Sequence, residues 1–328
     1  MINLDEKKAR DFLAKNKIDN CEIKKIAGDA SFRSYYRISY SDKKWILMFA
    51  PPSHENIGPF IKIDKFLIDH GFSAPRIFAV DEINGFILLE DFGDDTYSKV
   101  LAKNNSKSQE LHLYKKACDV LIEIGKIKAE IKLPHYNNAL LFREVMLFID
   151  WYLKLQKKEI SLAQISSFKN LWFDLFDQLS KKNSDKENSV LVLRDYHADN
   201  LMVLTNRQNH QQVGLLDFQD AVIGAKAYDL VSLLEDARRD LNQENRQELL
   251  QYYLQNFAGD KDSFLRDYEI LSLQRNIKII GIFSRLSLRD GKHQYLNLLP
   301  RVLDFVRSRL NSENPAFLEM SQLLKKFI

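Results

Sequence analysis

The sequence predicts an α+β fold in which a small antiparallel sheet comes first and a mainly helical region follows. Short apolar runs separated by turn residues fill roughly the first ninety residues, and the apolar period then becomes helical. No low-complexity linker divides the 328-residue chain. We therefore expect two lobes of one unit, an N-terminal lobe of residues 1–92 and a C-terminal lobe of residues 93–328.

The N-terminal lobe is expected to hold five strands and one helix. The strands are predicted at residues 21–26, 34–40, 45–50, 76–81 and 86–89. Turn residues at Gly28-Asp29, Ser41-Asp42 and Asn84-Gly85 separate them. A helix is predicted at residues 59–70, with Gly71 suited to its C-terminal cap. These elements describe an antiparallel sheet with a single helix packed on it.

Helical periodicity dominates the C-terminal lobe. Six apolar side chains between Phe168 and Leu179 recur at helical spacing, which predicts a helix with one buried face. Such an aromatic stripe is far more often core than cofactor site. Lys278 and Arg285 interrupt the most apolar run, residues 277–288, which predicts a buried helix rather than a membrane span of about 18 uncharged residues.

Composition limits the classes of function. The net charge of +3 arises from 48 basic and 45 acidic residues that are scattered along the chain, whereas nucleic-acid-binding proteins concentrate positive charge on one face. The N-terminus lacks the apolar segment of a secretory signal, and Cys21 and Cys118 lie far apart. We expect a cytoplasmic monomer or weak dimer with reduced thiols, and no nucleic-acid or membrane partner.

Three polar residues carry the predicted chemistry. Asp195 follows an apolar run, Asn200 lies five residues later and Asp217 lies 22 residues later, each beside a short apolar run. Two strands that meet as a hairpin would bring Asn200 and Asp217 to one point. Phosphoryl transfer from ATP needs a base for the hydroxyl proton, and oxygen ligands for Mg²⁺. We predict Asp195 as the catalytic base, and Asn200 and Asp217 as the metal ligands.

Each of these residues has a plainer interpretation when it is taken alone. Asp195 can cap a turn and Asp217 can be an ordinary strand-end acid, so the ordered set is what favours chemistry. His197 and Asp199 are candidate substrate contacts, although a histidine in such a loop is more often a structural partner, and this spacing lacks a further ligand for zinc. Asp229 is either a helix N-cap or a brace for the Asp195 loop.

A loop near the N-terminus is a candidate phosphate-binding segment. Gly28 and Ser31 can present backbone N–H groups and a hydroxyl, and Arg33 adds positive charge. With a single glycine, the segment matches no GxGxxG pattern, and a plain hairpin turn is the alternative. The sequence contains no GxxxxGK[ST], which excludes the P-loop class.

At these residues the chain resembles the aminoglycoside phosphotransferase and choline kinase superfamily, relatives of the protein kinases. Residues 193–195 stand where that family has His-Gly-Asp or His-Arg-Asp, Asn200 matches the loop asparagine, and Asp217-Phe218-Gln219 matches Asp-Phe-Gly. More narrowly, the chain resembles the N-acetylmuramate/N-acetylglucosamine kinases of bacterial peptidoglycan recycling. The similar stretches are residues 28–33, 48–52, 89–94, 228–239 and 274–283.

The resemblance implies a protein-kinase-like bilobal fold that binds ATP and Mg²⁺ in its cleft. Glu90 to Gly93 would form the hinge over the adenine, with Glu90 and Phe92 among the nucleotide contacts. The implied reaction phosphorylates a sugar hydroxyl, most readily the anomeric hydroxyl of N-acetylmuramate or N-acetylglucosamine. The alternatives are a kinase of an aminoglycoside, choline, ethanolamine or another amino alcohol, and a non-catalytic nucleotide-binding pseudokinase.

Two positions depart from the family pattern. Leu193 replaces the loop histidine, and Met48 stands near the strand lysine that binds the α- and β-phosphates in relatives. Arg33 or Arg37 can supply this charge from neighbouring strands, with a different geometry from that of lysine. No acid on the helix predicted at 59–70 is clearly placed as an ion-pair partner for this charge, and Asp64 is the candidate.

The acceptor pocket is predicted near residues 143–152, with Arg143 and Trp151 as candidate contacts. A carboxylated acceptor would favour a basic pocket, and a cationic acceptor would favour an acidic or aromatic one. Because this region contains both basic and acidic residues, it does not decide between a carboxylated and a cationic acceptor.

Overall fold

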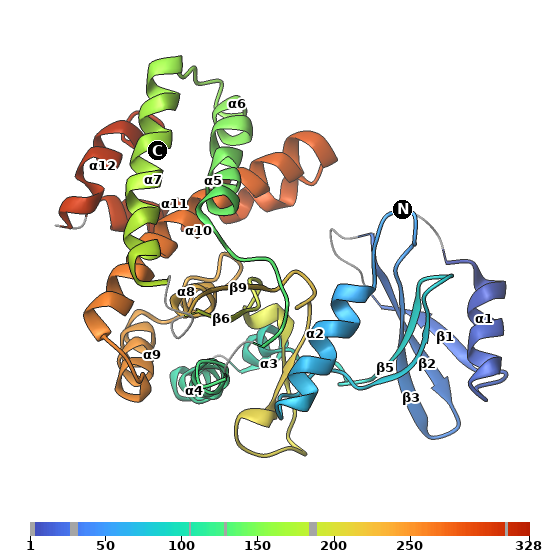
Figure 1. Cartoon of the computed structure of the whole chain (residues 1–328). Helices are drawn as coiled ribbons and strands as arrows, with labels where there is room; N and C mark the ends of the chain where they lie inside the picture. The colour runs from blue at the N-terminus through green and yellow to red at the C-terminus, as the bar shows by residue number, and fades with distance from the viewer. Residues whose placement is uncertain (1–3, 27–31, 105, 128–129, 184–188, 312–313) are drawn as a thin grey trace. The chain divides into compact units, whose positions relative to one another are not determined.

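The computed structural model describes residues 4–26, 32–104, 106–127, 130–183, 189–311 and 314–328 of the chain. Its contacts divide the chain into two compact units (Figure 1). The first unit consists of residues 1–100 and 199–220, and the second of residues 101–198 and 221–328. The return of residues 199–220 to the first unit is a feature that no sequence pattern indicated.

The first unit contains a five-stranded antiparallel sheet. In spatial order its strands are β1 (Glu22–Lys25), β2 (Ser34–Tyr40), β3 (Lys43–Phe49), β5 (Phe86–Glu90) and β4 (Ile77–Asp81). The predicted antiparallel sheet is therefore confirmed, with each strand close to its predicted bounds. Gly85 has a φ of +73°, and a Cβ there would lie 2.0 Å from the Ala50 carbonyl oxygen, so this turn requires glycine. The predicted Gly28-Asp29 turn lies outside the described residues.

The sheet carries two helices, on opposite faces (Figure 1). The predicted helix is α2 (Gly58–Asp69), which ends before Gly71, a residue with a φ of +81°. The other helix is α1 (Glu6–Lys15), whose N-cap Asp5 accepts the Lys8 backbone N–H at 3.2 Å. Phe12 of α1 belongs to the apolar core formed on that face of the sheet. The expectation of a single packed helix was wrong.

A short hairpin completes the first unit. Strands β7 (Leu201–Val203) and β8 (Val213–Leu215) pair antiparallel, as the sequence predicted. The Leu215 backbone N–H donates to the Ser73 carbonyl at 2.8 Å, which fixes β8 against the segment that follows α2. A Cβ at Gly214 would lie 2.9 Å from the Phe92 ring, so glycine allows that ring to pack directly on β8.

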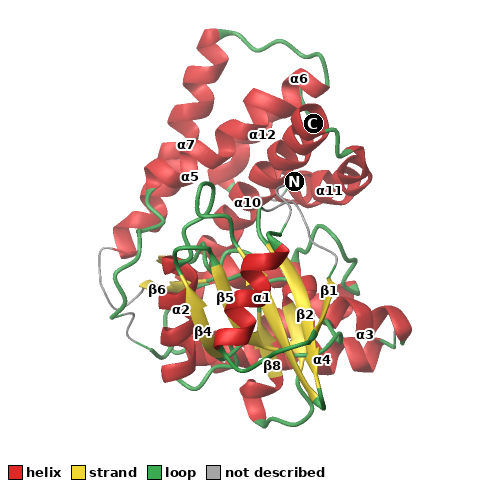
Figure 2. Cartoon of the chain, turned by 90° about the vertical axis from the view of Figure 1, so that its right-hand side faces the viewer, coloured by secondary structure: helices red, strands yellow, loops and turns green. Residues whose placement is uncertain are grey.

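The second unit is mainly helical (Figure 2). Its strands β6 (Ser189–Val192) and β9 (Val222–Ala225) form one antiparallel pair. A π-helical turn, Phe148–Tyr152, continues α5, and α3 (Tyr97–Lys103) crosses the point where the second unit begins. The remaining helices are α4 (Lys107–Ile124), α5 (Asn138–Leu147), α6 (Leu153–Leu155), α7 (Leu162–Asn183), α8 (Ala227–Leu234), α9 (Gln243–Asn256), α10 (Lys261–Asp290), α11 (Leu299–Leu310) and α12 (Leu318–Leu324).

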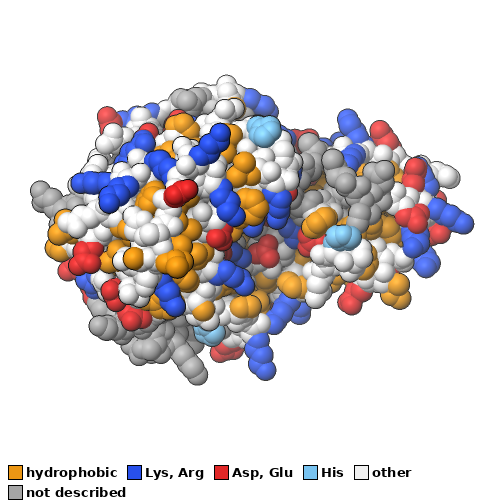
Figure 3. All heavy atoms as spheres, turned by 90° about the horizontal axis from the view of Figure 1, so that it is seen from above, with side chains coloured by type: hydrophobic (Ala, Val, Ile, Leu, Met, Phe, Trp, Pro, Cys, Tyr) orange, Lys and Arg blue, Asp and Glu red, His pale blue; other side chains and the backbone are white. Residues whose placement is uncertain are grey.

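The core of the second unit forms around α10, which packs against α5, α7, α8 and α11. Trp172 and Phe176 of the predicted stripe on α7 are fully buried, and so is Ile280 of α10. Both predictions of buried helices are therefore confirmed. Within the part of the chain that the structure describes, no helix combines the length and hydropathy that a membrane crossing requires. On the face shown in Figure 3, basic, acidic and apolar side chains are interspersed.

Candidate active site

Asp229 holds the loop that contains Asp195 through two hydrogen bonds to the loop backbone. Asp229 lies in the first turn of α8, and its carboxylate accepts the backbone N–H groups of Leu193 at 2.6 Å and Arg194 at 2.9 Å. Arg194 has a φ of +71°, a strained conformation for a residue with a side chain, and these two hydrogen bonds help to hold it. Of the two interpretations of Asp229, the brace is the one that the structure supports.

The Arg194 guanidinium joins a buried ionic network. It donates to Glu144 at 2.5 Å, and the same Glu144 oxygen lies 3.1 Å from the Lys278 ammonium. Tyr136 donates to the other Glu144 oxygen, and Lys278 donates to the Tyr228 hydroxyl at 3.2 Å. Burial by itself would raise the pKa of Glu144, but the charges of Lys278 and Arg194 outweigh it and lower that pKa. Glu144 is therefore ionised and bridges two cations.

This network also affects Asp195. The surrounding protein removes hydration from the Asp195 carboxyl, which by itself would raise its pKa, although the residue keeps an exposed surface. The positive charge of Lys278 opposes that effect most strongly, the charges of Arg275 and Arg194 add to it, and the pKa of Asp195 falls below its ordinary value. Asp195 is consequently an ionised carboxylate at neutral pH, the form that a proton acceptor requires.

His197 is a buried member of the same loop. Its Nε2 lies 3.3 Å from Nη1 of Arg238, and because arginine only donates hydrogen bonds, Nε2 accepts and Nδ1 carries the proton. Burial is the main cause that lowers the pKa of His197, and the Arg238 charge adds to it. His197 is therefore a neutral imidazole at neutral pH.

The hairpin places Asn200 and Asp217 at the same end. Asn200 directly precedes β7, Asp217 follows β8 by two residues, and the Leu216 backbone N–H donates to the Asn200 carbonyl at 3.0 Å. Asp217 has a φ of +57°, and its Oδ1 accepts from Gln219 at 2.9 Å and from Arg33 at 3.3 Å. The sequence-predicted hairpin thus brings an amide and a carboxylate together within the first unit.

The chemistry of these two side chains fits Mg²⁺. This ion prefers oxygen ligands and usually takes one or two protein carboxylates, while water and phosphate oxygens complete its shell. In the described ranges, no group of three or more His, Cys, Asp or Glu side chains is placed to hold a metal ion. The amide oxygen of Asn200 and the carboxylate of Asp217 are ligands of the kind that Mg²⁺ prefers.

Of the two candidate phosphate-binding arginines, Arg33 is the one placed beside Asp217. Arg37 lies on β2 and binds elsewhere: it donates to Asp91 at 2.6 and 3.0 Å and to Asp94 at 2.8 Å. Met48, which the resemblance places near the family lysine, is fully buried in β3. Gly28 and Ser31 lie outside the described residues.

The predicted hinge is held by a second ion pair. Glu90 ends β5 and accepts from Arg207 at 2.6 Å, and the Arg207 guanidinium lies 5.0 Å above the Phe92 ring. Asp64 of α2 is only 2% exposed, and no ion pair forms on it among the residues that the structure describes. Burial, with a smaller effect of Glu90, raises the pKa of Asp64 to about 7.

The other predicted substrate contacts lie on three different elements. Asp199 accepts from the Ser98 hydroxyl in the first unit. Arg143 is exposed on α5, one residue before the buried Glu144. Trp151 is half-buried in the π-helical turn, and the Lys154 ammonium lies 5.7 Å from its ring centre.

Sequence reasoning missed four residues around the Asp195 loop, namely Glu144, Lys278, Asp236 and Arg238. A lysine inside the most apolar run of the chain was a signal for Lys278, since a buried charge needs a partner. The charged segment Asp236-Ala237-Arg238-Arg239-Asp240 directly after a buried helix was a signal for the last two. Nothing local pairs Glu144 with Arg194, because 50 residues separate them.

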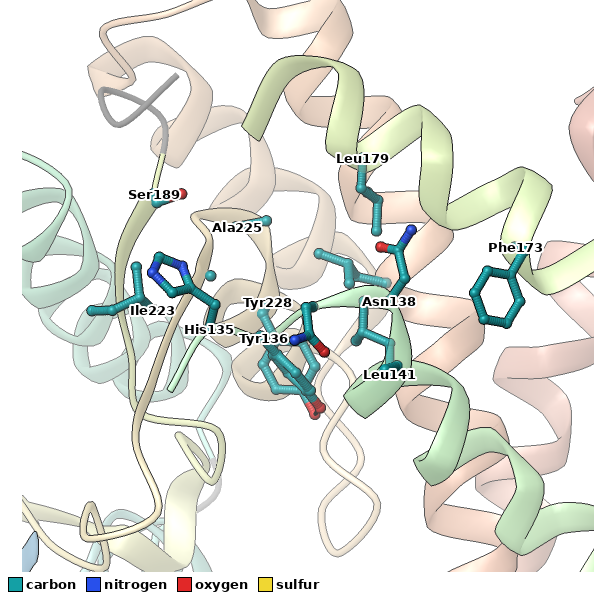
Figure 4. Close-up of a pocket in the computed structure, with 14 residues that line it drawn as sticks. His135, Tyr136, Asn138, Leu141, Phe173, Leu179, Ser189, Ile223, Ala225 and Tyr228 are labelled. Carbon is teal, nitrogen blue, oxygen red and sulfur yellow. Dashed lines mark hydrogen bonds between the residues drawn. The ribbon is translucent and has the colours of Figure 1, made fainter. Parts of the chain in front are cut away.

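The second unit also contains a cavity of about 540 Å³ (Figure 4). Its lining includes His135, Asn138 and Ile223, together with the rings of Tyr136 and Tyr228. Figure 4 shows the two tyrosine hydroxyls side by side, and they lie 3.1 Å apart. The cavity thus borders the tyrosines that contact Glu144 and Lys278.

Comparisons with known proteins identify the family of the chain. The sequence pattern of the phosphotransferase enzyme family matches residues 22–265. An N-acetylmuramate/N-acetylglucosamine kinase from Pseudomonas aeruginosa is 34% identical over 310 residues, which cover 92% of this chain and 88% of that protein. A protein of the same name from Neisseria meningitidis is 33% identical over 289 residues, which cover 86% of this chain and 83% of that protein. The structure of an ADP-bound aminoglycoside phosphotransferase superposes with a TM-score of 0.60 at 14% identity, covering 93% of this chain and 99% of that one.

Proposed function

Because the chain belongs to the phosphotransferase enzyme family, we propose that it transfers the γ-phosphoryl group of ATP to the anomeric hydroxyl of N-acetylmuramate or N-acetylglucosamine. The observation that carries the phosphoryl-transfer chemistry is the hydrogen bond between Leu216 and Asn200, which closes the hairpin with Asn200 and Asp217 at one end. The names of the relatives at 33–34% identity support the choice of sugar.

In the proposed reaction Asp195 accepts the proton of the acceptor hydroxyl. The acceptor oxygen forms a bond to the γ-phosphorus, and the bond from that phosphorus to the bridging oxygen of the departing ADP breaks. The lowered pKa of Asp195 keeps the carboxylate ready for this proton. Asn200 and Asp217 would hold Mg²⁺, which neutralises phosphate charge when it is bound.

Arg33 replaces the missing strand lysine in this proposal. It lies beside Asp217, whereas Arg37 holds Asp91 and Asp94 of the predicted hinge. The hinge at residues 90–93 would contact the adenine, and Gly28 and Ser31 would contact the phosphates. We place the reaction in the cytoplasm, where ATP is available, as a step in the reuse of cell-wall amino sugars.

The test is phosphorus NMR of the products formed with ATP, Mg²⁺ and a panel of amino sugars, aminoglycosides, choline and amino alcohols. We expect the resonance of a sugar 1-phosphate, coupled to the anomeric proton, with N-acetylmuramate or N-acetylglucosamine. Asp195→Asn should lower kcat by about 10²–10⁴-fold. Phosphorylation of an aminoglycoside or an amino alcohol alone would overturn the choice of sugar. Full binding of ATP without any product would favour the pseudokinase.

A further inference from the structure

The backbone directly before Asp195 has a strained conformation. The Asp195 backbone N–H donates to the Leu193 carbonyl at 2.9 Å, and Arg194 between them has a φ of +71°. This combination describes a γ-turn with a positive φ, which is rare for a residue with a side chain. Such a turn persists only where surrounding groups hold it. Because the turn ends at Asp195, it sets the direction in which that side chain leaves the backbone.

Ser232 holds the carbonyl group of this turn. It lies in α8 and is fully buried, and its hydroxyl donates to the Arg194 carbonyl oxygen at 3.3 Å. Asp229 lies three residues earlier on the same helix and accepts the N–H groups of Leu193 and Arg194. Helix α8 therefore holds the turn at its N–H groups through Asp229 and at its carbonyl through Ser232.

Arg275 fixes the direction of the Ser232 hydroxyl. Arg275 is a residue of α10 and is 4% exposed, and its Nη2 donates to the Ser232 oxygen at 2.8 Å. Because arginine only donates hydrogen bonds, Ser232 accepts from Arg275, and its one proton is left for the Arg194 carbonyl. Nη1 of Arg275 also donates to the Glu235 carbonyl at 3.4 Å, at the end of α8. The guanidinium thus joins α10 to the helix that holds the turn.

We propose that Ser232 and Arg275 are positioning residues for Asp195. Arg275 orients the Ser232 hydroxyl, and Ser232 holds the peptide between Arg194 and Asp195, so that the carboxylate points at the hydroxyl that is phosphorylated. The role of Asp195 as the base rests on the proposed function. The hydrogen bonds themselves do not, because all of these residues belong to the second unit.

The first test measures the turn without any substrate, by hydrogen exchange of the Asp195 backbone amide in the full chain. Ser232→Ala should raise the exchange rate of this amide about tenfold, because the turn loses one hydrogen bond. Arg275→Gln should have a similar effect. Ser284→Ala is the matched control, since Ser284 is fully buried in α10 and its hydroxyl also donates to a backbone carbonyl. Unchanged exchange in Ser232→Ala would overturn the proposal.

The second test measures kcat and the KM for ATP separately. Ser232→Ala should lower kcat about 10- to 100-fold through misplacement of the carboxylate, and should leave the KM for ATP unchanged. The double variant with Arg275→Gln should be no slower than the slower single variant, because both changes break the same chain of hydrogen bonds. Arg275→Lys should recover part of the loss. Since the Arg275 charge also lowers the pKa of Asp195, kcat is compared at a pH where this carboxyl is ionised in every variant.

The two tests separate this proposal from the proposed function. Faster exchange in Ser232→Ala supports the hold on the turn even when the wild-type protein phosphorylates none of the sugars, and only the proposed function then fails. With an active wild-type protein, an unchanged kcat in Ser232→Ala, or fully additive losses in the double variant, would overturn the positioning role. Thermal melting beside Ser284→Ala shows whether each variant is folded.

Discussion

Arg33 and Asp217 are 184 residues apart in the sequence, yet Nη2 of Arg33 lies 3.3 Å from Oδ1 of Asp217. The Arg33 side chain is 11% exposed and the Asp217 side chain is 41% exposed, so the pair has one buried and one accessible partner. Met48, predicted to lie near the position of the family lysine, is fully buried. The positive charge beside Asp217 therefore comes from Arg33, the residue directly before β2.

The first prediction concerns ATP binding by Arg33. Arg33→Met should raise the KM for ATP about 10- to 100-fold, because a charge-assisted contact to phosphate is lost. Arg33→Lys should recover part of the loss. Initial rates at varied ATP give the values, and Arg10→Met, which removes an exposed arginine of α1, is the matched control. An unchanged KM for ATP in Arg33→Met would assign the phosphate charge to another residue.

The second prediction concerns Mg²⁺ and Asn200. Asn200→Ala should raise the Mg²⁺ concentration for half-maximal rate about tenfold, because one oxygen ligand is lost. The hairpin should persist, since Leu216 bonds to the backbone carbonyl of Asn200. Rates at fixed ATP and varied Mg²⁺ measure the effect, with the exposed Asn206→Ala of the same hairpin as control. An identical Mg²⁺ dependence in both variants would remove Asn200 from the metal site.

Much of the fold could be predicted because its signals are local. The five strands show apolar runs between turn residues, and the β7–β8 hairpin follows from two short runs around a polar loop. Helix α1 was missed although Ala9, Phe12 and Leu13 stand at i, i+3 and i+4, because the rest of the segment is strongly charged. Its stability comes from packing on the sheet, which a local pattern does not show.

The site was less predictable because its interactions are long-range. Arg33 and Arg37 are equivalent by sequence, and only the tertiary structure assigns one to Asp217 and the other to Asp91. Likewise, Lys278 was expected in a buried helix, but its partner Glu144 lies on α5. Spacing along one segment reveals a motif, whereas charge pairing between distant helices depends on the packed fold.

The third prediction links Lys278 to the pH dependence of kcat. Asp195 must be ionised to accept a proton, so activity is lost as the pH falls through its pKa, which Lys278 helps to lower. Lys278→Met should raise that pKa and shift the acidic limb of kcat upward by about one pH unit. Glu144 keeps Arg194 as its partner in this variant.

Lys278→Arg is the control for charge, because it should leave the acidic limb near its wild-type position. Thermal melting of both variants tests whether the buried network still folds. A lower plateau of kcat with an unmoved acidic limb in Lys278→Met would show that Lys278 supports the fold and does not set the protonation of Asp195.

The fourth prediction concerns stability and Asp64. This carboxyl is 2% exposed, its Oδ1 has no hydrogen-bond partner among the described residues, and burial raises its pKa to about 7. In the unfolded chain its pKa is near the ordinary value of about 3.9, so the unfolded state loses the proton first. The stability that Asp64 contributes as a neutral acid is full below that value and is lost as the pH rises toward 7.

Asp64→Asn keeps the shape of the neutral acid and does not titrate. Between pH 5 and pH 8.5 the variant should gain about 2–3 kcal/mol in free energy of unfolding relative to the wild-type protein. Urea denaturation at the two pH values measures this gain. Asp69→Asn, at an exposed position on the same helix, should show none of it. A wild-type stability that falls no more steeply than that of Asp64→Asn over this range would mean that Asp64 is ionised in the folded protein and that its charge is compensated.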